Sequence, residues 1–109
     1  MIARAAGRWL TPEERVWCSA QPSFRLGLVT VLSCKESVYK ACGGVVSMQD
    51  VAVTMEGEWP GGWASARVST GAGAEQVTLW WSVRGGQILT LGVMGPVDQA
   101  RTLINCIVR

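Results

Sequence analysis

The sequence contains no histidine, a single tyrosine and a single phenylalanine, and charged residues make up only 17% of its 109 positions. No apolar run approaches the ~18 residues that a membrane-spanning helix requires, so we expect no membrane span. The opening residues, MIARAAGRWL, lack the apolar core of a secretory signal. A net charge of +2 is too small to indicate nucleic-acid binding. These absences together favour a cytoplasmic globular protein.

Four cysteines are present, at positions 18, 34, 42 and 106, and none forms a Cys-x-x-Cys pair. Without such spacing and without histidine, a structural zinc site is not expected. We therefore interpret the four as reduced thiols. The chain length allows a single domain, residues 1–109, with a modest core.

The segment Val31–Gly44, VLSCKESVYKACGG, carries most of the chemical groups of interest. Residues 34–42 contain neither proline nor glycine and are followed by Gly43-Gly44, a common helix stop. On a helix of ~100° per residue, an apolar stripe forms on one side from Cys34, Val38 and Ala41. The opposite side is predicted to present Lys35, Glu36, Tyr39 and Lys40 together.

Two helix starts are possible here. Ser33-x-x-Glu36 has the spacing of a capping box, which would use Glu36 to satisfy the Ser33 N–H group. A start near Leu26 or Leu28 would instead leave Glu36 free for other interactions. Val29-Thr30-Val31 favours a strand by propensity, but we favour the longer helix.

An earlier helix is predicted from Thr11-Pro12-Glu13-Glu14, with Thr11 as N-cap, Pro12 in the first turn and Glu14 at the capping-box position. It should run to about Ala20 and end before Pro22. In our interpretation both glutamates serve the cap and the helix dipole. A metal-ligand role for the pair is the alternative.

The second half of the chain has β-strand character. Glu58–Trp63 contains Pro-Gly in the order of a type II turn, Thr70–Glu75 is expected to be a loop, and Arg84-Gly85-Gly86 predicts a tight hairpin. A short helix over Val97–Ile107 would place Leu103, Ile104 and Ile107 on one side. Four antiparallel strands are expected, over residues 51–56, 64–69, 77–83 and 87–94.

The predicted fold class is α+β, with a long helix packed on an antiparallel sheet of about four strands. The tryptophans at positions 59, 63, 80 and 81 could form a ligand-stacking platform. Trp80 and Trp81 are adjacent on a strand and must point to opposite faces. We therefore expect these side chains to serve mainly core or interface packing.

Four segments also carry a family resemblance. The residues LSCKESVYKA at 32–41 are similar to the W/F-(S/C/T)-x-K-E-(A/S)-x-x-K-A signature of the 4′-phosphopantetheinyl transferases. The segments 10–15 (LTPEER), 50–54 (DVAVT) and 81–90 (WSVRGGQILT) resemble a helix start, a strand and a closing hairpin of the enterobactin-synthase and actinobacterial branch. The resemblance covers residues 10–94, and residues 95–109 form an additional tail.

The resemblance implies transfer of the 4′-phosphopantetheine group of coenzyme A to a serine of an acyl or peptidyl carrier protein, with Mg²⁺ as cofactor. By this match Glu36 is a magnesium ligand and a catalytic residue that takes the serine proton, directly or through water. Lys40 is the second catalytic residue and balances phosphate charge. Lys35 and Lys40 contact coenzyme A. An ordinary solvated helix face with a Glu36–Lys40 pair is the alternative reading.

Family members carry an upstream acidic Asp-x-Glu motif, whereas no aspartate precedes Glu36 in this chain. The chain resembles the C-terminal half of a pseudo-dimeric enzyme, and we expect weak or no activity unless an N-terminal partner is present. Self-association into a homo-oligomer is also expected, since a lone half would expose the surface that meets its partner. The other readings are a non-catalytic transferase-derived fragment and an unrelated small α+β binding module.

Overall fold

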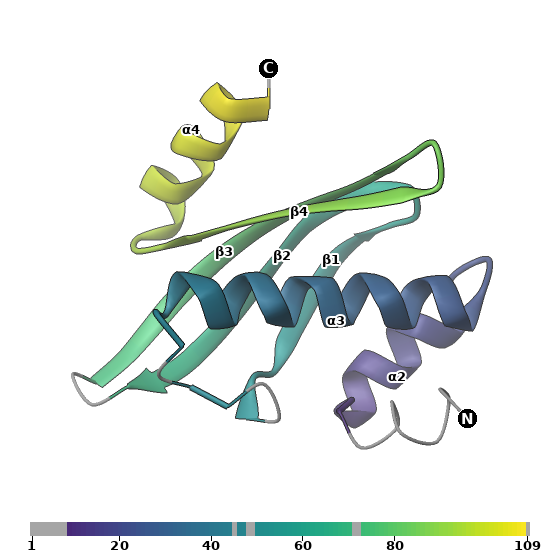
Figure 1. Ribbon diagram of the computed structural model, residues 1–109, viewed down its shortest axis with the longest axis horizontal. Coiled ribbons are helices and arrows are strands. Elements are labelled where there is room, and N and C mark those ends of the chain that lie inside the picture. The colour runs from purple at the N-terminus through teal and green to yellow at the C-terminus, as the bar shows by residue number, and fades with distance from the viewer. Residues whose placement is uncertain (1–8, 45, 48–49, 71–72, 109) are drawn as a thin grey trace.

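The computed structural model describes residues 9–44, 46–47, 50–70 and 73–108. Within them lie three helices and a four-stranded antiparallel sheet (Figure 1). The α+β class and the helix packed on the sheet are therefore confirmed. None of the helices in this described part is long and apolar enough to cross a membrane.

Helix α2, Pro12–Ser19, begins as predicted. The Thr11 hydroxyl accepts a hydrogen bond from the Glu14 N–H group, and the Glu14 carboxylate accepts one from the Thr11 N–H group. This reciprocal pair is the capping box that the sequence indicates. The first helix is therefore confirmed within one residue of its predicted end.

Helix α3, Phe24–Ala41, is the long helix that we favoured. Its N-cap is Ser23, so Ser33 lies inside the helix and the alternative capping box at Ser33 is wrong. At the other end the Gly44 and Gly43 N–H groups donate to the carbonyls of Tyr39 and Lys40. Both glycines have positive φ, so this end is a Schellman motif.

The sheet follows the chain in simple order, β1-β2-β3-β4, through three antiparallel pairings. Val77 of β3 pairs with Ala66 of β2 and Met94 of β4. The strand count is as predicted, while β1 begins and ends two residues later than expected. The four strands are β1 (Val53–Glu58), β2 (Gly61–Thr70), β3 (Gly73–Arg84) and β4 (Gln87–Met94).

Two of the connections differ from the predicted pattern. The β1–β2 turn has Trp59 and Pro60 as its central residues, joined by a cis peptide bond. Because Pro60 is the second central residue and not the first, the predicted type II turn is wrong. The loop expected over Thr70–Glu75 is largely strand, since β2 reaches Thr70 and β3 begins at Gly73; residues 71–72 lie outside the described part.

The β3–β4 hairpin is confirmed. Arg84 pairs with Gln87 across a two-residue loop. Gly85 and Gly86 have φ values of 56° and 77°, the conformation of a type I′ turn that glycine adopts without steric cost.

The main core lies between α3 and one face of the sheet (Figure 1). Cys34 and Val38 of α3 pack there with Leu79 and Trp81 of β3, all fully buried. Trp81 also meets Trp17 edge to face, with ring centroids 5.4 Å apart. Trp81 is thus a core residue, and Trp80 on the opposite face is only half-buried, as strand geometry predicts.

Close approach of α3 to the sheet depends on a glycine in β4. A Cβ atom on Gly92 would lie 3.0 Å from Leu79 Cδ2 and 3.4 Å from the Ser37 carbonyl oxygen of α3. The absence of a side chain therefore lets the helix backbone rest on the strand.

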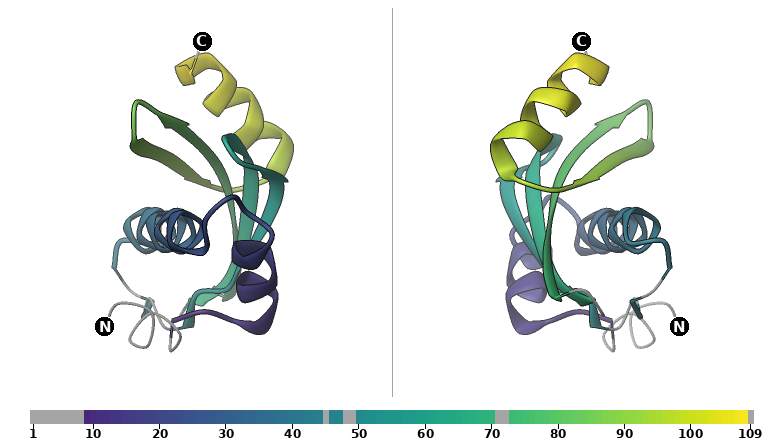
Figure 2. Two further views of the ribbon diagram at one scale, coloured as in Figure 1. Left: turned by 90° about the vertical axis from the view of Figure 1, so that its right-hand side faces the viewer. Right: turned by 90° about the vertical axis from the view of Figure 1, so that its left-hand side faces the viewer.

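Helix α4, Val97–Val108, covers part of the other face, so that α3 and α4 lie on opposite sides of the sheet (Figure 2). Its helical state is confirmed. The predicted apolar side is wrong, because Ile104 is fully buried whereas Leu103 and Ile107 are exposed. Burial falls instead on Ala100 and Ile104, which are four residues apart and share a helix face. The Arg101 guanidinium lies 5.1 Å from the ring centroid of Trp63 in β2.

Candidate functional site

Glu36 and Lys40 lie on the exposed surface of α3. Lys40 Nζ is 3.2 Å from Glu36 Oε1, and their side chains are 72% and 57% exposed, respectively. The pair has the i, i+4 spacing that brings side chains together on a helix. Both groups are therefore accessible to a ligand, and the prediction that they share an outward face is confirmed.

Lys35 does not share that face, so this part of the predicted arrangement is wrong. Its side chain is 1% exposed, and its Nζ lies 2.8 Å from Glu14 Oε1. The same ammonium group donates a hydrogen bond to the Trp9 carbonyl. In this structure Lys35 is an internal ion-pair partner and is not exposed to a ligand.

The position of Lys35 on the helix explains its burial. It follows Leu28 by seven residues and precedes Cys42 by seven, a spacing that keeps residues on nearly the same side of a helix. Leu28 and Cys42 are both buried. Because α3 is covered by α2 as well as by the sheet, its buried sector is wider than the Cys34–Val38–Ala41 stripe, and Lys35 falls within it.

Glu14 connects three of the four segments that carry the family resemblance. It belongs to the 10–15 segment and pairs with Lys35 of the 32–41 segment. Its Oε2 accepts a 2.7 Å hydrogen bond from the Val53 N–H group in the 50–54 segment. Sequence reasoning assigned Glu14 to the helix cap and missed this buried role, for which the only signal was the presence of an acid and a base in separate motif segments.

The fourth segment meets α3 through hydroxyl groups. Thr90 Oγ1 of β4 lies 2.6 Å from Ser37 Oγ and 3.1 Å from Ser33 Oγ. Ser33 and Ser37 flank Glu36 in the sequence, and Thr90 ends the 81–90 segment. All four segments, separate in sequence, therefore meet around α3.

Two thiols, those of Cys18 and Cys34, are buried beside the Glu14–Lys35 ion pair. Burial, together with the neighbouring Glu14 carboxylate, raises the pKa of Cys18 to about 11 and that of Cys34 to about 12. Desolvation disfavours the thiolate, so both cysteines stay protonated at neutral pH and are poor nucleophiles.

A magnesium site would depend on Glu36. No group of three or more His, Cys, Asp or Glu side chains with metal-binding geometry is found among the described residues. Mg²⁺ retains several waters and takes one or two carboxylates together with substrate phosphates. The accessible carboxylate of Glu36 is compatible with that coordination, and Glu14 is not, since both its oxygens have internal partners.

Comparison of the chain with protein-family models, with curated proteins and with solved structures gives no match.

Proposed function

We propose that this chain is a 4′-phosphopantetheinyl transferase-type domain that supplies the coenzyme A-binding half of the reaction site. The observation that carries the proposal is the meeting of the four resembling segments around α3. Glu14 joins the first three through Lys35 and Val53, and Thr90 joins the fourth through Ser33 and Ser37. An accidental likeness in four separate segments would not require them to contact one another.

The ion pair buries Lys35 and leaves its neighbour Glu36 directed outward. Adjacent residues on a helix are ~100° apart, so anchoring Lys35 toward α2 turns Glu36 away from the core. Glu36 and Lys40 then present one carboxylate and one ammonium group at the surface. Lys40 is the cation that would face the coenzyme A diphosphate.

In the proposed reaction, the oxygen of a carrier-protein serine forms a bond to the phosphorus that bears the pantetheine group. The bridging P–O bond breaks and 3′,5′-ADP leaves. Glu36 would hold the magnesium ion and accepts the serine proton, directly or through water, and Lys40 stabilises negative charge on the 5′-phosphate oxygen of the leaving 3′,5′-ADP. Bound magnesium would supply further neutralisation of that charge.

The proposed site needs a second surface. Val29, 43% exposed, precedes Glu36 by seven residues on the same side of α3. Leu26, 41% exposed, lies three residues before Val29, so the two apolar side chains adjoin on the helix surface, and adjoining exposed apolar side chains favour contact with another protein surface. We propose that an N-terminal half or a second copy of the chain covers this side and supplies the missing acidic ligand.

The first experiment is a calorimetric titration of the chain with coenzyme A, with and without Mg²⁺. Lys40→Ala and Glu36→Gln each remove one exposed group, and we expect both to abolish magnesium-dependent binding. Arg67→Gln is the matched control, because Arg67 is an exposed cation on β2 outside the site. Equal binding by all three variants, or no binding by the parent chain, would refute the proposal.

The second experiment is a loading assay with an apo carrier protein, coenzyme A and Mg²⁺. We expect little turnover by the chain alone. Robust turnover that Glu36→Gln abolishes would show that the chain is a complete enzyme and that no second half is required.

A second candidate function, an α+β binding module without transferase chemistry, is favoured by one observation. Lys35 is buried, so only one of the two cations expected beside Glu36 is accessible. This candidate predicts that coenzyme A fails to bind even when Mg²⁺ is present, which the same titration measures.

A further inference from the structure

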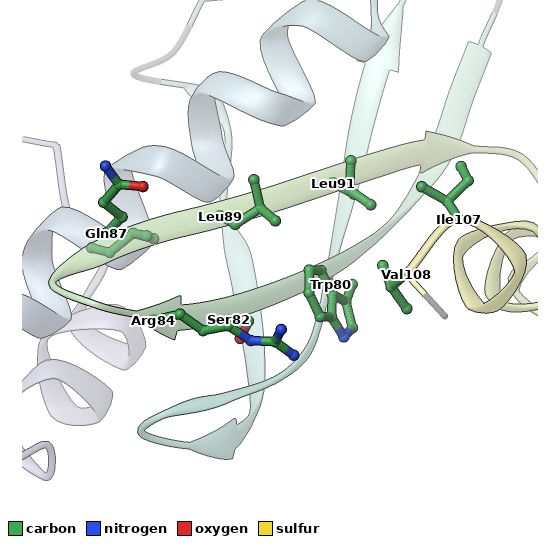
Figure 3. Close-up of a pocket in the computed structure, with 9 residues that line it drawn as sticks. Trp80, Ser82, Arg84, Gln87, Leu89, Leu91, Ile107 and Val108 are labelled. Carbon is green, nitrogen blue, oxygen red and sulfur yellow. The ribbon is translucent and has the colours of Figure 1, made fainter.

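On the sheet face opposite α3, a groove of about 490 Å³ runs between the β3–β4 hairpin and the end of α4. Figure 2 shows the hairpin tip curving away from α4, and Figure 3 shows the side chains that line the space between them. Nothing in the proposed transferase site uses this groove, since Glu36 and Lys40 project from α3 on the other side of the sheet.

The floor of the groove is three rungs of the β3–β4 ladder, which change from polar to apolar. At the hairpin tip Arg84 is opposite Gln87. Ser82 is opposite Leu89 in the middle rung, and Trp80 is opposite Leu91 at the inner end. The inner end is closed by two residues of α4: in Figure 3 Val108 lies beside Trp80 and Ile107 lies beyond Leu91.

The polar end carries one positive charge. Arg84 is exposed, and no carboxylate among the described residues forms an ion pair with it. The inner end has the opposite character, because the last turn of α4 brings carbonyl groups with partial negative charge. A ligand anion is therefore favoured at Arg84 and disfavoured beneath α4.

The dimensions fit a single hydrocarbon chain. From Arg84 to Trp80 the strand spans about 13 Å at ~3.3 Å per residue. The floor is two strands wide, at ~4.8 Å between strands, and Leu89, 59% exposed, leaves apolar surface open to solvent. Burying this surface under a ligand chain would stabilise the complex by ~25 cal/mol for each Å² of apolar surface removed from water.

We propose that the groove binds a free, single-chain anionic amphiphile of the fatty-carboxylate class. The carboxylate accepts hydrogen bonds from the Arg84 guanidinium. The hydrocarbon chain lies over Leu89 and ends against Trp80 and Ile107. A free molecule fits better than a membrane lipid because the apolar end lies under α4 and not on an open surface.

The test is an NMR titration of the whole chain with decanoate, below its aggregation concentration. We expect saturable one-to-one binding, with shifts confined to residues of β3, β4 and the end of α4. Decan-1-ol, which has the same chain length without the charge, should bind about tenfold more weakly.

Two variants with matched controls assign the ends of the ligand. Arg84→Gln should weaken decanoate binding about tenfold, whereas Arg67→Gln on β2 should leave it unchanged. Leu89→Gln should weaken it severalfold, whereas Leu103→Gln, an exposed leucine of α4 that does not line the groove, should not. All four substitutions are at exposed positions, so the fold should persist.

Three results would overturn the proposal: no saturable binding, equal binding of decanoate and decan-1-ol, or decanoate affinity that neither Arg84→Gln nor Leu89→Gln changes. Co-sedimentation with anionic phospholipid vesicles separates the two ligand sources. We expect the protein to stay in the supernatant. If instead the protein pellets with the vesicles and decanoate does not bind, this face of the sheet would be assigned to contact with a membrane surface. Because coenzyme A is not used, failure here is distinct from failure of the proposed transferase function.

Discussion

The buried ion pair between Glu14 and Lys35 makes a strong prediction about stability. Lys35→Met removes the ammonium group and keeps much of the side-chain volume, which leaves the Glu14 carboxylate buried without its cation. Removing one partner of a buried pair costs ~3–5 kcal/mol in the free energy of unfolding. Domains of this size are stabilised by only ~5–15 kcal/mol, so the variant should lose a large share of its stability.

The neighbouring exposed pair provides the control. Lys40→Met removes an ammonium group of the same helix from a pair whose side chains are 72% and 57% exposed. Exposed i, i+4 pairs contribute only ~0.3–0.5 kcal/mol, so this variant should unfold almost as the parent does. The two lysines are five residues apart on the same helix, so the expected difference in stability between the two variants comes from the difference in burial.

The double variant Glu14→Gln, Lys35→Met tests the cause. With both charges removed, the loss should be smaller than the sum of the two single losses, because no unpaired charge remains buried. The remaining loss would come from the hydrogen bonds to the Thr11 and Val53 N–H groups, because a glutamine amide has a single acceptor oxygen and can replace only one of them. Urea unfolding followed by tryptophan fluorescence measures five proteins: the parent, Lys40→Met, the single variants Lys35→Met and Glu14→Gln, and the double variant. Exposed ion pairs contribute at most about 1 kcal/mol. A Lys35→Met protein whose free energy of unfolding lay within that margin of the parent value would therefore refute the burial of Lys35.

Three further predictions concern the thiols and the helix contact. A soluble thiol reagent should label Cys106, the exposed cysteine, and reach Cys18 and Cys34 only after unfolding; rapid modification of all three in the folded protein would contradict their burial. The free energy of unfolding should fall as the pH rises above ~9, where thiols of the unfolded chain ionise. The fall should continue up to the raised pKa values of about 11 for Cys18 and about 12 for Cys34, because over this range the unfolded chain releases protons that the folded chain retains. The urea midpoint over this range measures the fall, and Cys34→Ala should make it shallower. Gly27→Ala should destabilise by ~1–3 kcal/mol, although alanine is the better helix former, because the new Cβ would lie 3.0 Å from Cys18 Cα; a raised urea midpoint would contradict that contact.

Local signals in the sequence were enough for most of the secondary structure. The capping box at Thr11 and Glu14, the double glycine after α3 and the Gly85-Gly86 hairpin each satisfy backbone groups within a few residues. Such features depend on short-range geometry, and the chain adopted them as predicted. The Trp59-Pro60 turn was misassigned because the strand register, which depends on the partner strand, decides which residue is central.

The candidate site divides in the same way. That Glu36 and Lys40 face outward together follows from helix periodicity and from the Cys34 and Val38 stripe, so the sequence alone determined it. The fate of Lys35 was decided by tertiary structure, because only the packing of α2 against α3 brings Glu14 within 2.8 Å of its ammonium group. Periodicity describes one helix, whereas burial depends on every surface that covers it. The groove beside Arg84 has the same origin, since it exists only where α4 returns across the outer face of the β3–β4 hairpin.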